Sequence, residues 1–210
     1  MEATTSPSPA VAIIGAGIAG MSAAIALRRS GIEALLFEQT PKFARIGAAI
    51  NLTPNAVKVL DRLNIGASLR ARASQPLYRL SRVWNTGEET SRLELGDAGL
   101  ERYGAPQLMV HRADLLAALE NALPADVVKL GKQLIGLDRS GASVVLHFAD
   151  GTKTSASAVI GADGIHSKVR ECIFGDDLPH YTGMVAYRDI VPSDRAPHYD
   201  ASGFTKWWGP

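Results

Sequence analysis

The stretch that decides the fold is Val11-Ala12-Ile13-Ile14-Gly15-Ala16-Gly17-Ile18-Ala19-Gly20. An apolar run leads directly into Gly-x-Gly-x-x-Gly, and an alanine-rich segment follows. In this pattern Gly15 permits a tight turn, Gly17 leaves room for a diphosphate, and Gly20 lets a helix pack closely on the strand. The first residues of that helix, Ile18 and Ala19, belong to the helix N-terminus whose amides and positive dipole end attract the diphosphate. The stretch therefore predicts a strand, turn and helix that bind a dinucleotide.

A carboxylate follows the glycine turn at the spacing that this interpretation requires. The next predicted strand covers residues 33–38 and ends at Glu38, about 20 residues after the turn. A carboxylate there accepts hydrogen bonds from ribose hydroxyls and repels a 2′-phosphate, so the adenosine half is expected to be unphosphorylated. The alternative is a surface charge at a strand end. We favour the ribose partner because the whole strand-turn-helix-strand unit is present.

A membrane or signal segment is the first alternative to this prediction. Residues 10–27 carry no charge, which meets the lower length limit of about 18 residues for a membrane-spanning helix. The glycines in this stretch have the nucleotide-binding spacing, however, and buried parallel strands also read as continuous apolar runs. No positive charge precedes the stretch, as a secretory signal would require. We therefore expect no membrane span.

Composition favours one substantial core and excludes several classes of partner. The 210 residues are 46% hydrophobic and carry a formal net charge of +1, so no strong field attracts nucleic acid or an anionic membrane. The single cysteine, Cys172, excludes an internal disulfide and predicts an intracellular, cytoplasmic protein. The histidines and the cysteine show no zinc-ligand spacing, so we expect no metal site.

The order of predicted elements departs from a plain alternation of strand and helix. Helices are expected at residues 18–30, 53–64, 112–122 and 167–174. Strands are expected at 11–14, 33–38, 77–94 (as strands or a hairpin), 127–139, 143–148, 158–160 (short and buried) and 184–191. A nicotinamide-dependent dehydrogenase would continue the alternation beyond the first unit, so this order favours a flavin-type dinucleotide domain.

Several segments, in this order, resemble the class A flavoprotein aromatic hydroxylases, the family of salicylate and p-hydroxybenzoate hydroxylases. The segments are 15–20 with Glu38, 47–50 with 54–56 and 60–63, His111-Arg112-Ala113-Asp114-Leu115-Leu116, Gly161-Ala162-Asp163-Gly164-Ile165-His166-Ser167-Lys168-Val169-Arg170, and Tyr187-Arg188 with Trp207-Trp208-Gly209-Pro210. The resemblance implies an α/β fold: a Rossmann-like FAD-binding domain of the glutathione reductase type, with a mixed sheet. It also implies an incomplete FAD-binding domain at 10–175 and the start of a β-rich substrate domain at 176–210. The Ser/Pro stretch before them predicts a disordered lead-in at residues 1–9.

The resemblance gives roles to Arg112, Asp163 and Gly164. It implies that Arg112, at a helix start, contacts the FAD diphosphate, as a guanidinium does well; the alternative is a solvated arginine beside Asp114. It implies that Asp163 and Gly164 face both FAD and NAD(P)H. The alternative there is a simple Asp-Gly turn.

Further residues are placed near the cofactor by the same resemblance. Gly47 and Ala48 are expected near the isoalloxazine or the ribityl chain, and Arg45 near a flavin or nicotinamide phosphate, with an ordinary loop charge as its alternative. Leu134 is expected beside the adenine, although core packing explains it nearly as well.

No side chain is nominated as a catalytic acid or base. His166 is interpreted as a polar turn residue, and Cys172 as a small core residue.

One signature of the family is missing from this sequence. Family members carry Gly-Asp-Ala/Ser-Ala-His after a strand, and neither Gly96-Asp97-Ala98 nor Gly175-Asp176-Asp177 matches it. We therefore expect the N-terminal part of such an enzyme, with the ADP half of the FAD site largely encoded, exposed apolar surface, and weak FAD binding.

The leading hypothesis is an FAD-dependent monooxygenase that uses NAD(P)H and O₂ to hydroxylate a small aromatic substrate. The first alternative is a catalytically inactive fragment that binds FAD or another nucleotide. The second is a nicotinamide-dependent dehydrogenase, from which Arg112 and the Asp-Gly segment distinguish the flavin hypothesis.

Overall fold

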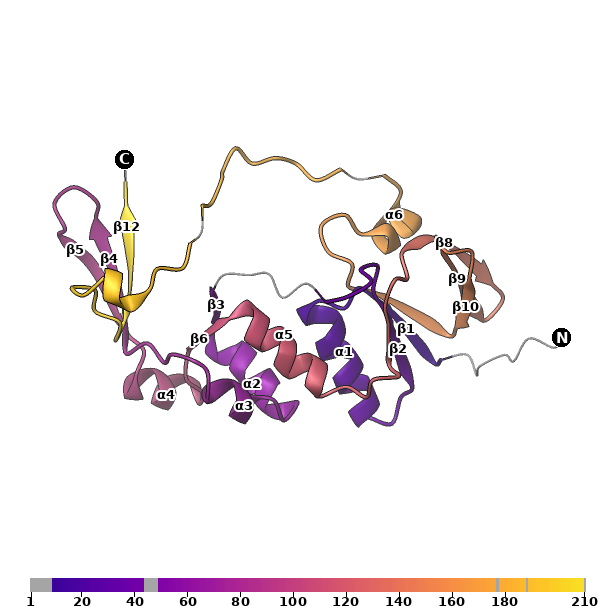
Figure 1. Cartoon of the computed structure of the whole chain (residues 1–210), viewed down its shortest axis with the longest axis horizontal. Coiled ribbons are helices and arrows are strands. Elements are labelled where there is room, and N and C mark those ends of the chain that lie inside the picture. Colours follow the sequence, from indigo (N-terminus) through magenta and orange to yellow (C-terminus); the bar gives the residue numbers. More distant parts are fainter. Residues whose placement is uncertain (1–8, 44–48, 177, 188, 210) are drawn as a thin grey trace. The chain divides into compact units, whose positions relative to one another are not determined.

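A computed structural model of the chain describes residues 9–43, 49–176, 178–187 and 189–209 (Figure 1). The predicted lead-in at residues 1–9 falls, apart from Pro9, outside these residues. The chain divides into two compact units, which we call the first and the second unit. The first consists of Met1–Arg45 and Leu119–Val185, and the second of Ile46–Ala118 and Ala186–Pro210. Each unit is described by itself, and the predicted domain boundaries stay a prediction.

A parallel sheet forms the centre of the first unit. Its strands, in spatial order, are β11 (Ala158–Gly161), β1 (Val11–Ile14), β2 (Ala34–Phe37) and β7 (Val128–Lys129). Helix α1 (Ile18–Arg29) connects β1 to β2 and packs against both. The predicted strand-turn-helix-strand unit is therefore confirmed, and with it the α/β fold class.

Helix α1 begins directly after the glycine turn and ends before a second glycine. Gly31 follows the C-cap Ser30 with a φ of 76°, the left-handed conformation that commonly ends a helix. The helix has 12 residues, so the charge-free stretch that suggested a membrane segment is divided between β1, the turn and α1. Among the helices that the structure describes, none is long and apolar enough to cross a membrane.

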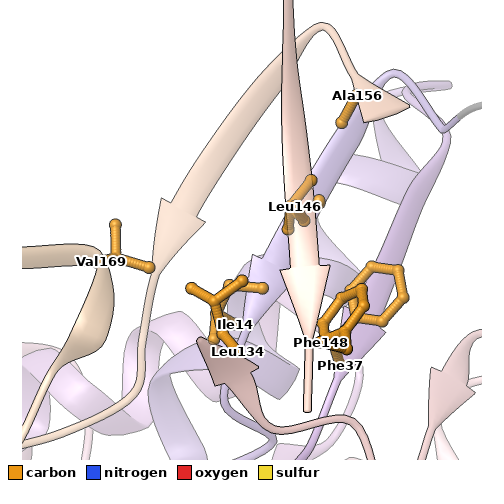
Figure 2. Packing of buried hydrophobic residues seen from close by; sticks show 8 residues of the cluster. Ile14, Phe37, Leu134, Leu146, Phe148, Ala156 and Val169 are labelled. Atoms are coloured by element: carbon orange, nitrogen blue, oxygen red, sulfur yellow. The ribbon is translucent and has the colours of Figure 1, made fainter. Parts of the chain in front are cut away.

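An antiparallel sheet covers one face of the parallel sheet. It consists of β8 (Leu134–Ser140), β9 (Ser143–Phe148) and β10 (Lys153–Ala156), in the order β10-β9-β8. Between the two sheets lies an apolar cluster in which the rings of Phe37 and Phe148 stack with centroids 4.9 Å apart (Figure 2). Helix α6 (Lys168–Phe174) adds Val169 to this cluster. The remaining buried members are Ala12, Ile14, Leu134, Leu146 and Ala156.

The second unit contains two further sheets. One is the antiparallel pair β3 (Ala49–Leu52) and β6 (Leu108–His111); the other has the order β12-β4-β5. Its strands are β4 (Tyr78–Val83), β5 (Glu89–Glu94) and β12 (Phe204–Trp208), and β4 and β5 form the hairpin expected at 77–94. The helices are α2 (Pro54–Arg62), α3 (Gly66–Arg70), α4 (Asp97–Tyr103) and the 3₁₀ turn Ser193–Arg195. Helix α5 (Arg112–Asn121) starts in this unit and ends in the first.

Four predictions about individual segments are wrong. The strand expected at 127–139 is two strands, β7 and β8, which belong to different sheets and are separated by residues 130–133. The described residues of 184–191 form no strand; Met184 is 84% and Tyr187 95% exposed, because no neighbouring strand pairs with them. The segment predicted as a short buried strand at 158–160 is the edge strand β11, whose side chains are exposed or half-buried. Cys172 is exposed, since α6 buries only Val169.

Candidate dinucleotide-binding site

A cavity of about 560 Å³ lies in the first unit, where β1, β2 and β11 end. Ligands of open parallel sheets bind in this position, outside the carboxyl ends of the strands. Three of the segments singled out in the sequence line it: the glycine turn, the end of β2 and the Asp-Gly turn. The lining residues are Ile14, Gly15, Gly17, Phe37, Glu38, Gln39, Lys132, Gln133, Leu134, Ile135, Ala162, Asp163, Gly164, Ile165, His166 and Lys168.

The three glycines of the first turn have three different environments. Gly15 has a φ of 98°, and a Cβ there would lie 2.4 Å from the carbonyl oxygen of Ala162. A Cβ on Gly20 would lie 1.9 Å from the carbonyl oxygen of Gly15. Gly17 instead faces open space, with no described atom within 4 Å of such a Cβ, and it lines the cavity. Gly15 and Gly20 are thus needed for the turn to close, whereas Gly17 keeps space clear beside it.

The carboxylate of Glu38 closes over the same turn. Its Oε2 accepts a hydrogen bond from the backbone N–H of Ala16 at 2.8 Å. Its Oε1 accepts from the backbone N–H and the hydroxyl of Thr40, at 2.9 and 3.0 Å. These contacts fix the carboxylate at the cavity wall. A carboxylate oxygen has two lone pairs; Oε1 uses both on Thr40, whereas Oε2 uses one on Ala16. Oε2 therefore retains acceptor capacity for a ribose hydroxyl.

The carboxylate of Asp163 organises the second turn. Oδ1 accepts from the hydroxyl of Ser167 at 2.6 Å, and Oδ2 from the backbone N–H of Val169 at 3.1 Å. Ser167 in turn caps α6 by accepting from the N–H of Arg170 at 3.0 Å. Gly164 has a φ of 79°, in the region that favours glycine. The structure thus shows Asp163 ordering its turn, and both Asp163 and Gly164 line the cavity.

The fourth wall of the cavity begins at the loop between β7 and β8. The sequence suggested either core packing or a place in the nucleotide site for Leu134. Leu134 belongs to the apolar cluster and also lines the cavity. Lys132 and Gln133 line the cavity beside it and were not singled out as site residues. The signal that could have found them is weak, since their position depends on the pairing of β7 with β2. His166 also lines the cavity, consistent with a polar turn residue.

The remaining predicted site residues are not part of this cavity. Arg112 is the first residue of α5 and lies in the second unit, so its contact with the diphosphate stays a prediction. The carboxylate of Asp114, its expected neighbour, accepts a hydrogen bond from the guanidinium of Arg72 at 3.0 Å. Arg45, Gly47 and Ala48 lie outside the described residues.

The cavity suits the ADP half of a dinucleotide. The first amides of α1 have no acceptor within the helix and carry the positive end of its dipole, which suits a diphosphate. Open space at Gly17 lets such a group approach the backbone. In the described part of the chain, no group of three His, Cys, Asp or Glu residues is arranged to hold a metal ion.

Comparison with known proteins agrees with this geometry. Residues 8–187 match the family model described as FAD binding domain. The chain is 42% identical over 205 residues to 6-hydroxynicotinate 3-monooxygenase of Pseudomonas fluorescens, covering 97% of this chain and 53% of that protein. It is 34% identical over 192 residues to salicylate hydroxylase of Pseudomonas putida, covering 87% of this chain and 43% of that protein.

A solved structure shows the same fold. The crystal structure of Klebsiella pneumoniae HpxO complexed with FAD and uric acid matches with a TM-score of 0.69 and 34% identity, over 77% of this chain and 41% of that one. The chain spans about half the length of the curated relatives it matches. Because the family model covers most of the chain, this protein belongs to the FAD-binding domain family of the class A flavin monooxygenases.

Proposed function

We propose that this chain holds the ADP half of FAD for a monooxygenase that uses NAD(P)H and O₂ to hydroxylate a small aromatic substrate. The proposal covers the activity of the whole protein, since the matched relatives are about twice as long. Support for the substrate class comes from those relatives, whose names describe aromatic and heteroaromatic monooxygenases. An intracellular, cytoplasmic location stays a prediction.

One observation carries the proposal. The glycine turn, Glu38 and Asp163 come from three separate segments of the sequence and line a single cavity at the carboxyl edge of one parallel sheet. The first two offer the chemistry that parts of ADP require: open backbone amides for the diphosphate and a fixed carboxylate for the ribose. Apolar side chains at the same cavity, Phe37 and Leu134, supply a surface for a flat base.

The residues of this chain bind and orient the cofactor in this proposal. The amides of Ile18 and Ala19 receive the diphosphate at the start of α1, and Gly17 leaves its approach unobstructed. Glu38 accepts from the ribose hydroxyls while its contact with Ala16 N–H keeps it in place. FAD, when bound, supplies the redox chemistry that passes electrons from NAD(P)H to O₂. No described residue is assigned a proton-transfer role.

The second unit contributes a cavity that suits an apolar ring. Its volume is about 340 Å³, and Met109, Val110 and Phe204 are among its apolar lining residues. His111 and Tyr199 bring polar groups to the same wall. We assign the aromatic substrate class in keeping with this lining, because pockets for small organic molecules combine apolar surface with few polar groups.

A competition titration tests the proposal. FAD fluorescence is followed as the purified chain is added, with ADP and FMN as competitors, and binding by the ADP half predicts that ADP displaces FAD while FMN does not. NADH and NADPH oxidation by the FAD-loaded protein then separates the monooxygenase from an inactive nucleotide-binding protein. Equal competition by FMN, or no binding by a folded chain, would contradict the proposal.

A further inference from the structure

The cavity has an unassigned residue, Lys132, whose ammonium group is held in a fixed position. Its Nζ donates to Oδ2 of Asp150 at 2.5 Å and to the hydroxyl of Thr152 at 2.9 Å. Thr152 is itself fixed, because its N–H and hydroxyl donate to Oδ1 of Asp150 at 3.0 and 2.6 Å. An ammonium has three donors. Two are used by the residues that the structure describes, which leaves one N–H for a ligand in the cavity that Lys132 lines.

The backbone of Lys132 is fixed to the residue that we assign to the ribose. Its N–H donates to the carbonyl oxygen of Glu38 at 2.8 Å, and the N–H of Gly131 donates to the carbonyl oxygen of Thr40 at 3.0 Å. The loop before β8 is therefore tied to the end of β2. Lys132 and Glu38 present their side chains from adjacent points on the cavity wall.

The order of strands decides which part of the dinucleotide Lys132 meets. Across the sheet the order is β11, β1, β2 and β7, so the residues after these strands are the Asp-Gly turn, the glycine turn, Glu38 and the loop with Lys132. Neighbouring strands lie about 4.8 Å apart, which puts Lys132 roughly 10 Å from the glycine turn. A diphosphate at β1 and a ribose at β2 place the base beside the loop after β7.

The surroundings of Lys132 suit a flat, neutral base. Its ammonium lies 5.8 Å from the ring centroid of Phe148, and that ring stacks on Phe37, which lines the cavity. Leu134 lines the cavity two residues further along the chain. The salt bridge with Asp150 offsets the charge of Lys132, so the side chain acts as a hydrogen-bond donor more than as a charge for the diphosphate.

We propose that Lys132 donates a hydrogen bond to a ring nitrogen of the adenine and thereby determines specificity for an adenine dinucleotide, with Asp150 and Thr152 as its positioning residues. This inference rests on the proposed binding of FAD in the same cavity. It assigns the loop after β7 to the base, next to the Glu38 assigned to the ribose.

The test compares three ligands on four proteins. Affinities for FAD, ADP and inorganic pyrophosphate are measured on the wild type and on the variants Lys132→Met, Asp150→Asn and Lys153→Met. Lys153 is exposed on β10 and does not line the cavity, so it is a matched control for removing a lysine charge. The proposal predicts a loss of about tenfold for FAD and ADP in Lys132→Met, as expected for one charge-assisted hydrogen bond.

Pyrophosphate separates contact with the base from attraction of the diphosphate. Lys132→Met is expected to bind pyrophosphate as the wild type does, and Lys153→Met to bind all three ligands as the wild type does. Asp150→Asn keeps the ammonium but loosens it, so a smaller loss of about threefold is expected for FAD and ADP, with pyrophosphate binding unchanged. Equal losses for ADP and pyrophosphate in Lys132→Met, which disappear at high salt, would overturn the proposal.

Two controls distinguish the possible outcomes: a measurement of folding and a variant of the glycine turn. Circular dichroism confirms that each variant is folded, and if Lys132→Met is not, Asp150→Asn and its ADP-to-pyrophosphate ratio decide the question. If the wild type binds FAD and Gly17→Val does not, while Lys132→Met binds normally, only the role of Lys132 is refuted. If the wild type binds neither FAD nor ADP, the proposed function and this inference are refuted together.

Discussion

Two glycine-containing turns follow adjacent strands of the same parallel sheet and use their polar groups differently. After β1, Gly17 faces open space and the first amides of α1 have no acceptor within the helix. After β11, the carboxylate of Asp163 accepts from Ser167 and Val169 and so holds its turn against α6. The first turn leaves the opening amides of α1 for a ligand, whereas the second uses its carboxylate to hold the fold. Substitutions in the two turns should therefore separate binding from stability.

The largest effect on stability is expected within the first turn, at Gly20. A Cβ at this position would lie 1.9 Å from the carbonyl oxygen of Gly15 and 3.2 Å from Cδ1 of Leu36. Because the nearer atom belongs to the backbone, the turn must shift, and Gly20→Ala should lower the free energy of unfolding by about 3 kcal/mol. Urea unfolding measures this loss. A change below about 1 kcal/mol would show that the turn and α1 are not packed as described.

A smaller loss is expected at the second turn. Asp163→Ala removes the acceptor for the hydroxyl of Ser167 and for the N–H of Val169, and should lower the free energy of unfolding by about 1–2 kcal/mol. Asp163→Asn keeps one acceptor oxygen and should lose less. Asp176→Ala, at an exposed carboxylate just beyond α6, serves as the control. If Asp163→Ala weakens FAD binding without any loss of stability, the contrast between the two turns is wrong.

The smallest effect is expected from a third turn, at Asp150. Hydrogen bonds from Lys132 and Thr152 lower the pKa of Asp150 from its usual 3.8 to about 2. Because its pKa is lower in the folded protein, the ionised carboxylate stabilises the fold above pH 4, and this contribution is lost as the pH falls toward 2. Asp150→Asn should flatten the decline in stability over this range, measured by urea unfolding at several pH values. An unchanged slope would show that Asp150 is not held in the folded state.

The parts of the site that sequence predicts are those with strong local signals. Gly15, Gly17 and Gly20 stand in a fixed spacing between a β-branched run and an alanine-rich helix, so the turn and its neighbours could be predicted to within a few residues. Glu38 follows from the length of the same unit. Its hydrogen bond to the N–H of Ala16 could not be predicted, because three side-chain torsions and a contact across 22 positions decide it.

The parts that sequence does not predict depend on long-range pairing. Lys132 reaches the cavity because β7, only two residues long, pairs with β2, and so short a strand has no distinct pattern. The pair β3 and β6 joins segments more than fifty positions apart and is missed for the same reason. The reverse error occurs at 184–191, where apolar residues suggest a strand that finds no partner among the described residues. The prediction that Cys172 is a core residue is wrong because a helix of 7 residues buries little of its surface.

Binding of FAD by two glycine-to-valine variants tests the central claim most directly. Gly17 and Gly136 both have negative φ values and both have no described atom within 4 Å of an added Cβ, but only Gly17 lines the cavity. Each variant should therefore keep the wild-type free energy of unfolding to within about 1 kcal/mol. In a calorimetric titration, Gly17→Val is predicted to bind FAD about 100-fold more weakly than the wild type, and Gly136→Val to bind it equally well. Equal FAD affinity in a folded Gly17→Val variant would contradict the assignment of this turn to the cofactor.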